Sequence, residues 1–179
     1  GEPETMAIPR SGIGHVSVSA NGAGIAMASM STAANLEGLA FDPASGTVGA
    51  RRRITASSDR STLPVVSPDG HWIVFSKVQQ GGQENLWVVR RDGTGLRQVT
   101  NNAARDRVPS WIAGGTRLMF QSSRDGGRFQ LWTIAADGGT PIQVTDRPES
   151  LIFALGSPDG TRALVATFPG AKLLRFDPR

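Results

Sequence analysis

The sequence predicts an all-β protein, a β-propeller built from four-stranded antiparallel blades with four blades in the chain. The main observation is an internal repeat: Trp87 and Trp132, and likewise Thr100 and Thr145, lie 45 positions apart. A period of roughly 40–45 residues is typical of a four-stranded propeller blade. The composition agrees, because 22 glycines and 11 prolines among 179 residues favour turns over helices.

The second and third repeats each divide into four short apolar strands separated by turn residues. Bulky and β-branched residues in these runs favour strands. The second repeat, about 63–100, predicts strands at Leu63–Val66, Trp72–Ser76, Leu86–Arg90 and Leu96–Thr100. The third, about 107–145, predicts strands at Val108–Trp111, Arg117–Gln121, Leu131–Ala135 and Ile142–Thr145.

The first and last repeats are less regular. The first, about 14–55, predicts strands at His15–Ser19, Ile25–Ser29, Leu36–Phe41 and Arg51–Thr55, with a long loop at Asp42–Gly49. The fourth, about 151–179, predicts strands at Leu151–Leu155, Arg162–Thr167 and Leu173–Phe176 and lacks an outer strand. Residues 1–8 resemble an outer strand and are expected to complete the last blade, in the same chain or in a partner.

The number of blades raises the question of closure. Propellers typically have four to eight blades. An open four-bladed arc would expose an apolar sheet face at each end, which soluble proteins avoid. We therefore expect two chains to associate head to tail into one eight-bladed ring, although a closed four-bladed monomer is an alternative.

Charge and cysteine content exclude several classes of function. The net charge of +4 comes with arginines scattered between strands, and Arg51–Arg53 has no interleaved aromatic residues for stacking nucleic-acid bases. We therefore expect no nucleic-acid partner. The chain has no cysteine, so it has neither disulfides nor thiolate metal sites. No apolar run approaches the roughly 20 residues that span a bilayer, so we expect no membrane span.

The repeat resembles that of a known family. The pattern Ser-Pro-Asp-Gly, an apolar strand, Leu86-Trp87-Val88, Asp92-Gly93 and Gln98-Val99-Thr100 is similar to the TolB-type propeller repeat. The resemblance implies an interaction platform of the bacterial cell envelope or periplasm. It also allows a propeller fused to a cytoplasmic kinase or winged-helix regulator, or to a peptidase of the prolyl oligopeptidase kind. Propellers of this family generally have six or more blades.

No catalytic constellation is evident. The only histidines, His15 and His71, have no partner motif for a metal site, and no nucleophile elbow or phosphate-binding loop is present. The aspartates of the Asp-Gly turns are expected to bond their own backbone rather than calcium. Trp87 and Trp132 recur at one blade position, which favours packing between sheets. We therefore predict no enzymatic activity and no cofactor.

The candidate binding surface is the loop-rich face, where each outer strand connects to the next blade. These connections, residues 56–62, 101–107 and 146–150, concentrate mixed charge. Trp111 ends an inner strand and could face the central channel. The candidate binding residues are Asp59, Arg60, Arg105, Asp106, Arg107, Trp111, Arg147 and Glu149. We predict a module that binds a protein or peptide through this face; ordinary solvation of the charges, and an accessory or gating segment of a larger hydrolase or regulator, are the alternatives.

Overall fold

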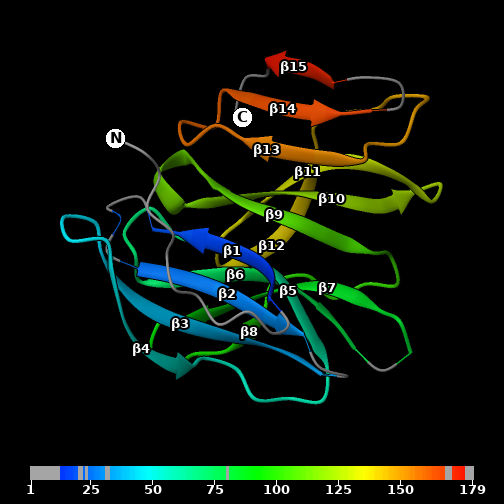
Figure 1. Cartoon of the computed structure of the whole chain (residues 1–179). Coiled ribbons are helices and arrows are strands. Elements are labelled where there is room, and N and C mark those ends of the chain that lie inside the picture. Colours follow the sequence, from blue (N-terminus) through cyan, green and yellow to red (C-terminus); the bar gives the residue numbers. More distant parts are fainter. Residues whose placement is uncertain are drawn as a thin grey trace.

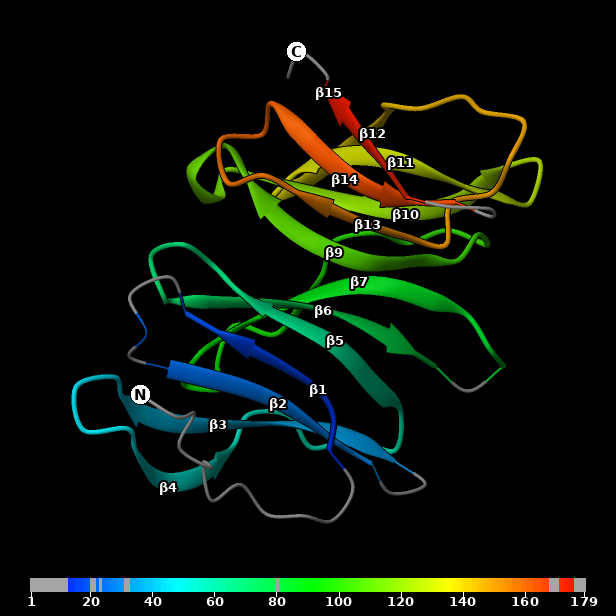
Figure 2. The same cartoon turned by 45° about the horizontal axis from the view of Figure 1, so that its top comes forward.

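The computed structural model describes residues 13–19, 22, 24–30, 33–79, 81–167 and 171–175, and shows four antiparallel sheets stacked in chain order (Figure 1). Three sheets have four strands, and the fourth has three within the described residues. The first sheet lies at one end of the stack and the last at the other, as the second view also shows (Figure 2). The arrangement is an arc of propeller blades, and no closure is seen among the described residues.

Each sheet follows the chain from its inner to its outer strand. The first sheet contains β1 (Ile13–Val18), β2 (Gly24–Met30), β3 (Ala34–Asp42) and β4 (Thr47–Arg53). The second contains β5 (Arg60–Val66), β6 (Trp72–Val78), β7 (Glu84–Arg90) and β8 (Arg97–Gln98). The third contains β9 (Asp106–Ile112), β10 (Arg117–Asp125), β11 (Arg128–Ala135) and β12 (Gly138–Gln143), with the 3₁₀ turn η1 (Ala113–Gly115) between β9 and β10. The last contains β13 (Phe153–Gly156), β14 (Arg162–Ala166) and β15 (Ala171–Arg175).

The bounds predicted for the inner strands agree with the structure better than those predicted for the outer strands. The predicted loop at Asp42–Gly49 is wrong, because β3 and β4 pair as far as Asp42 and Thr47 and leave only a short turn. Ala44 N donates to Asp42 Oδ1 at 2.9 Å, which holds that turn. The outer strand of the second sheet shrinks to two residues, since an outermost strand is paired on one edge only. The predicted strand at residues 1–8 lies outside the described residues.

The turn between the first two strands of a blade has the predicted chemistry. Asp69 Oδ1 accepts hydrogen bonds from the Ser67 hydroxyl at 2.5 Å and from His71 N at 2.9 Å. Gly70 has φ of 75°, a left-handed conformation that glycine adopts without steric cost. The hydroxyl of Ser157 makes the same 2.5 Å bond to Asp159 in the last blade. These aspartates are therefore turn residues.

Two inner strands carry a bulge at equivalent positions. Leu63 and Val108 both have positive φ, 54° and 52°, and each precedes a proline. The pairing register shifts at both places. A positive φ is rare for a β-branched residue such as Val108, because the backbone is then strained. The bulges divide each inner strand into a segment at the loop-rich face and a segment that packs against the neighbouring sheets.

The hydrophobic core lies between sheets. Phe75 and Phe120 are fully buried, each in the gap between its own sheet and the preceding one. The recurring Trp87 and Trp132 pack against these same two clusters but are only partly buried. A third cluster joins the third and fourth sheets: Ile112, Met119, Leu131, Leu151, Ala154, Ala163 and Val165. Packing between sheets, as expected for these tryptophans, is therefore confirmed, although their burial is incomplete.

Neighbouring inner strands are linked by a hydrogen bond at one repeated position. Val66 N donates to Ser17 Oγ at 3.1 Å, and Gly156 N donates to Ser110 Oγ at 3.2 Å. At the middle junction, Trp111 Nε1 donates to Val65 O at 2.9 Å. The order of the sheets in the arc is thus fixed by a polar contact at each junction as well as by the apolar core.

Candidate functional site

The charged residues of the loop-rich face are largely paired with one another. Lys77 Nζ lies 3.0 Å from Asp59 Oδ2, and Arg105 approaches Glu84 Oε2 with its Nε at 3.1 Å and its Nη2 at 2.9 Å. The Arg147 and Glu149 side chains are 3.5 Å apart. Most of the mixed charge predicted as a binding rim is thus neutralised locally. Arg60 is exposed, and its side chain makes no hydrogen bond or ion pair among the described residues.

Asp106 and Trp111 lie in the interior rather than on the rim. Asp106 is completely buried, and Arg124 Nη2 donates to both of its carboxylate oxygens, at 3.0 and 2.8 Å. Asn102 Nδ2 donates a further bond at 2.7 Å. Trp111 is only 8% exposed and packs in the core between the second and third sheets. The expectation that Trp111 faces a central channel is therefore wrong, because its ring is buried and its indole Nε1 donates a hydrogen bond to Val65 O.

Arg107 occupies an intermediate position. Its guanidinium lies 3.8 Å from the centre of the Phe129 ring, and its Nε is buried without a hydrogen-bond partner. Burial lowers the pKa of Arg107, because the charged form loses hydration. Gln121, which pairs with Arg107 across β9 and β10, is fully buried with its amide atoms unpartnered. Arg107 is therefore partly buried against Phe129, and its Nε and the Gln121 amide remain without hydrogen-bond partners within the described residues.

Sequence reasoning missed the cations that sit over the repeated tryptophans. Lys77 Nζ is 4.6 Å from the Trp87 ring centre, and the Arg124 guanidinium is 4.8 Å from that of Trp132. Each cation also pairs with an aspartate at the start of the inner strand, Asp59 or Asp106. The 45-residue period aligns Lys77 with Ser122 and not with Arg124, so the repeat did not reveal the pair. Arg124 lies two residues beyond Ser122, near the end of β10, where the pairing with β11 becomes irregular.

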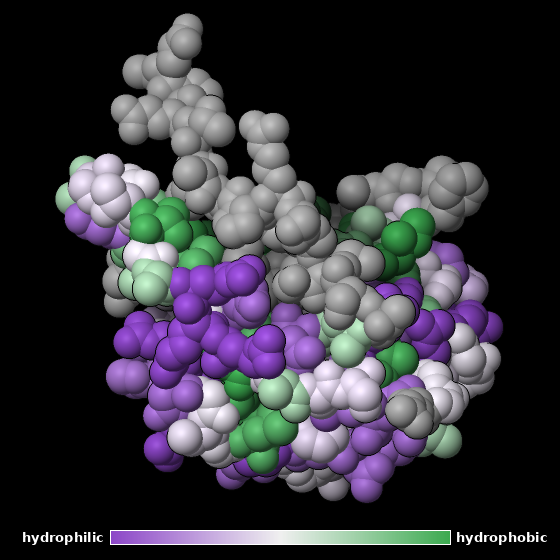
Figure 3. Space-filling view, turned by 60° about the horizontal axis from the view of Figure 1, so that its bottom comes forward, coloured by the Kyte–Doolittle hydropathy of each residue, from purple (hydrophilic) through white to green (hydrophobic). Residues whose placement is uncertain are grey.

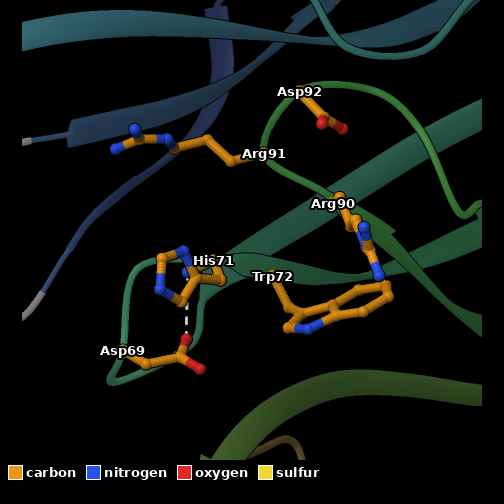
Figure 4. Close-up of a pocket in the computed structure, with 6 residues that line it drawn as sticks. All are labelled: Asp69, His71, Trp72, Arg90, Arg91 and Asp92. Atoms are coloured by element: carbon orange, nitrogen blue, oxygen red, sulfur yellow. Dashed lines mark hydrogen bonds between the residues drawn. The ribbon is translucent and has the colours of Figure 1, made fainter.

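The opposite face, where the Asp-Gly turns lie, has a pocket of about 410 Å³ between two turns of the second sheet. Figure 4 shows its lining residues: Asp69, His71, Trp72, Arg90, Arg91 and Asp92. The Arg90 guanidinium lies 5.1 Å from the centre of the Trp72 ring, and Arg91 points away from that ring (Figure 4). A stacked cation and a second, separate cation thus border one hollow.

The two aspartates of this pocket are engaged in their turns. The Ser67 hydroxyl and His71 N bond to Asp69, and these bonds lower the pKa of its carboxyl group. The Thr94 hydroxyl at 2.6 Å and Thr94 N at 2.8 Å do the same for Asp92. Both carboxylates are held ionised by donors already in place, so neither is poised to exchange protons with a substrate.

A second, larger hollow adjoins the pocket. It measures about 670 Å³, lies between the first and second sheets, and shares Arg91 and Asp92 with the smaller pocket. Its walls are mostly apolar and include Ala26, Gly38 and Ile73. No group of three or more possible metal ligands occurs among the described residues, and none of the described helices is long and apolar enough to cross a membrane.

Comparison with known proteins identifies the repeat. The model of the TolB β-propeller domain matches residues 17–172, which is most of the chain. The chain belongs to the TolB β-propeller repeat family. Its resemblance to TolB-type blades, expected from the Asp-Gly turns and the recurring Trp87 and Trp132, is thereby confirmed.

Several solved structures share the fold of this TolB-type domain. It superposes on a TolB from Agrobacterium tumefaciens with a TM-score of 0.71 and 22% identity, covering 84% of this chain and 52% of that one. TolB from Acinetobacter baumannii gives 0.70 and 20%, with 87% and 38% covered. A puromycin-hydrolysing peptidase from Mycobacterium tuberculosis gives 0.74 and 13%, with 97% and 29% covered. These similarities establish the fold alone.

The domain is short beside these structures. It spans about half of the Agrobacterium TolB chain and less of the other two. No curated protein matches its sequence.

Proposed function

We propose that this TolB-type domain is a non-enzymatic interaction module that binds a segment of another protein. The observation that supports the proposal is the pair of adjoining hollows on the Asp-Gly turn face. They share Arg91, whose side chain forms no hydrogen bond or ion pair within the described residues. A free cation at the edge of an apolar groove suits a peptide that carries an acidic residue beside aliphatic ones.

The larger hollow, called the groove from here on, lies where the first sheet has small residues and the second sheet has large ones at the equivalent positions. Ala26 and Gly38 face each other across β2 and β3. The equivalent pair in the second sheet is Val74 and Val88, both fully buried against the third sheet. Replacing two valines with alanine and glycine removes side-chain volume from one junction only. Ile54 fills the space beside Gly38, where a Cβ would lie 3.1 Å from Ile54 Cδ1, and the remaining hollow between the first two sheets is the room for a ligand's aliphatic side chain.

The pocket beside the groove supplies a second kind of contact. Trp72 offers a partly exposed aromatic ring with Arg90 over it, and Arg97 lies 5.8 Å from the same ring centre. Aromatic and arginine side chains are enriched where proteins bind one another. A bound segment would therefore place its aliphatic residue in the groove, its carboxylate at Arg91, and a neighbouring residue on the Trp72 platform.

The test uses an array of 12-residue peptides in which Asp or Glu is combined with Leu, Ile or Val at every spacing, with a matching array in which Lys replaces the acids. We expect binding to the acidic array only. Fluorescence polarisation on selected peptides then measures their affinity. Arg91→Glu should weaken binding at least about tenfold, or about 1.4 kcal/mol. Binding of the Lys array in preference to the acidic one would reject the proposed ligand chemistry.

The loop-rich face is the second candidate surface, because Arg60 is exposed and unpaired and the Arg105 side chain is about half exposed. Arg60→Glu is therefore the matched control for Arg91→Glu, since both replace an exposed arginine without breaking a described ion pair. If Arg60→Glu removes binding and Arg91→Glu does not, the ligand occupies the loop-rich face instead.

The absence of catalysis is part of the same proposal. It is supported by the turn bonds that occupy Asp69 and Asp92 in the pocket that also contains His71. A screen with esterase, peptidase, glycosidase and pectate-lyase substrates should give no turnover. Turnover that is lost in His71→Ala or Asp69→Asn would reject this part of the proposal.

The alternative role is an accessory or gating propeller within a larger hydrolase or regulator. The similarity to part of a peptidase chain favours this alternative over an isolated enzyme. In that role the ligand of the turn face would be the catalytic or regulatory domain itself. A cell-envelope or periplasmic location, which TolB-type blades suggest, suits the module; a fusion to a kinase or winged-helix regulator would place it in the cytoplasm.

A further inference from the structure

Buried polar atoms without a hydrogen-bond partner distinguish one place in the described part of the molecule. Exposed charge does not, because hydrophilic residues predominate on the face seen in Figure 3. Among the described residues, Gln121 is the one side chain in which two buried polar atoms, the amide nitrogen and oxygen, both lack a partner. Its neighbour across β9 and β10 is Arg107, whose Nε is also buried and unpartnered. Native proteins leave few buried polar groups unpaired, so such a pair on adjacent strands indicates a missing partner.

Arg107 and Gln121 point to the same side of the third sheet, because directly paired residues of antiparallel strands share a face. Gln121 also pairs with Leu131, which belongs to the cluster between the third and fourth sheets. Phe129 precedes Leu131 by two residues on β11, so it lies on this face as well. Its ring centre is 3.8 Å from the Arg107 guanidinium. The three side chains Arg107, Gln121 and Phe129 therefore line one junction at its loop-rich end.

This junction lies inside the arc, between two sheets that are both described. Leu151 N donates to Phe129 O at 2.8 Å, and Phe129 N donates to Ser150 Oγ at 2.9 Å, so the connection to the last sheet packs along this strand. Gln121 is fully buried, whereas Arg107 and Phe129 are partly exposed. The unpartnered groups are thus enclosed by the third and fourth sheets and open to solvent through Arg107 and Phe129.

The repeat indicates that an acid is missing at this junction. Phe129 is equivalent to Glu84, one 45-residue period earlier, and Glu84 accepts a hydrogen bond from Arg105 Nη2 at 2.9 Å. The Arg107 guanidinium, by contrast, has no hydrogen bond or ion pair among the described residues. Burial, the largest cause, lowers the pKa of Arg107, and Glu84, whose charge acts in the opposite direction, is already bonded to Arg105. The counter-charge that the repeat supplies at one junction is therefore absent at the next.

We propose that this junction binds a carboxylate whose neighbouring carbon carries an N–H donor, the group found in N-acylated amino acids and at the end of a peptide chain. The carboxylate accepts from the Arg107 guanidinium and from the Gln121 amide nitrogen, and the ligand N–H donates to the Gln121 oxygen. A guanidinium presents its donors in a fixed plane that suits a carboxylate, and the Phe129 ring holds that plane in place. The site lies on the face opposite to the groove, so it goes beyond the proposed function and does not depend on it.

Two-dimensional NMR of side-chain N–H groups tests the site in the intact chain. Adding N-acetylglycine up to about 50 mM should shift the Arg107 Nε–H and Gln121 amide signals along a saturable curve. N-acetylglycinamide, which lacks the carboxylate, should shift neither signal. Acetate, which lacks the N–H donor, should bind at least about fivefold more weakly. The absence of a saturable shift with N-acetylglycine, or an equal shift with N-acetylglycinamide, would overturn the proposal.

A peptide that ends in glycine distinguishes the two sources of the same group. Binding at least about tenfold tighter than that of N-acetylglycine would support the proposal with a chain terminus as the ligand. Equal affinity would support it with a free small molecule, because the rest of the peptide then adds nothing.

Gln121→Leu separates binding from folding. Because it replaces two unpartnered buried atoms by apolar ones in a similar volume, the free energy of unfolding should be unchanged or higher, whereas N-acetylglycine should bind at least about fivefold more weakly. Unchanged affinity in this variant would overturn the proposal. The same pair of measurements decides the question if Arg107→Gln fails to fold.

Arg107→Gln should abolish the saturable shift. The matched control is Arg128→Gln, which removes an exposed arginine next to Phe129 and should change the affinity by less than about twofold, because salt screens a charge at the surface. Equal weakening by the two variants would show a general attraction of anions to a basic surface and would count against the site.

Discussion

Thr145 Oγ1 lies 2.8 Å from Gln130 Oε1 and accepts a hydrogen bond from Leu131 N at 2.9 Å. The Gln130 oxygen also accepts a bond from Arg147 N at 3.2 Å. One buried threonine thus joins the segment after the outer strand to the third strand, and its amide partner continues the link to the connection that starts the next blade.

The same arrangement recurs in the two preceding blades. Thr100 Oγ1 accepts from Leu86 N at 3.0 Å and lies 3.4 Å from Asn85 Oδ1. Thr55 Oγ1 accepts from Leu36 N at 2.8 Å and lies 3.3 Å from Asn35 Oδ1. In each of these three blades the repeated threonine therefore links the third strand to the segment after the outer strand. Its period in the sequence reflects this structural role.

Thr145→Val should destabilise the domain by about 1–3 kcal/mol, because it keeps the shape but leaves Leu131 N and the Gln130 oxygen short of a buried partner. Thr140→Val, at an exposed position of the preceding strand β12, should change stability by no more than about 0.5 kcal/mol. Urea denaturation of both variants measures the difference. Equal free energies of unfolding for the two variants would mean that the hydrogen bonds of the Thr145 hydroxyl do not stabilise the blade.

Arg124→Met should destabilise the domain by about 3–5 kcal/mol, because it leaves the Asp106 carboxylate buried without its cation. Adding Asp106→Asn to Arg124→Met should recover part of the loss, since the buried charge is then removed. Arg128→Met, at an exposed position at the start of the following strand, serves as the control. Additive losses in the double variant would contradict a direct Asp106–Arg124 interaction.

Trp132→Ala and Trp87→Ala should each cost about 3 kcal/mol, at the lower end of the range for aromatic truncations because both rings are only partly buried. Each substitution also removes the ring beneath a cation, Arg124 or Lys77. Denaturant titration of each variant is the measurement. Losses below about 1 kcal/mol at both positions would show that these rings contribute little to the packing between sheets.

The carboxyl group of Asp159 should titrate near its folded pKa of about 2, below the usual 3.8, because the Ser157 hydroxyl and the Thr161 amide and hydroxyl donate to the ionised form. Since the folded pKa is depressed, this contribution to stability is present above pH 4 and is lost as the pH falls toward 2. Carbon-detected NMR titration would give the midpoint. Ser157→Ala should raise it, and an unchanged midpoint would contradict the assigned cause.

The sequence predicted best those features that depend on local chemistry. Ser67, Asp69 and Gly70 define their turn within a few residues, so the turn was recognised together with its period. The outer strands were predicted less well, because one of them, Arg97–Gln98, is held by only a short ladder and its neighbours settle its length. The candidate site depended even more on contacts between distant residues.

By itself, the sequence determined the blade: its four strands, its turns and the 45-residue spacing of Trp87 and Trp132, because each follows from the order of residues along a short stretch of chain. The tertiary structure decided which charges are free. Arg124 on β10 pairs with Asp106 on the neighbouring strand β9, whereas Arg91 has no side-chain partner among the described residues and lies beside the groove lined by Ala26 and Gly38. Such relationships depend on packing between strands and sheets, where one missing side chain or one bulge changes what a neighbouring residue can touch.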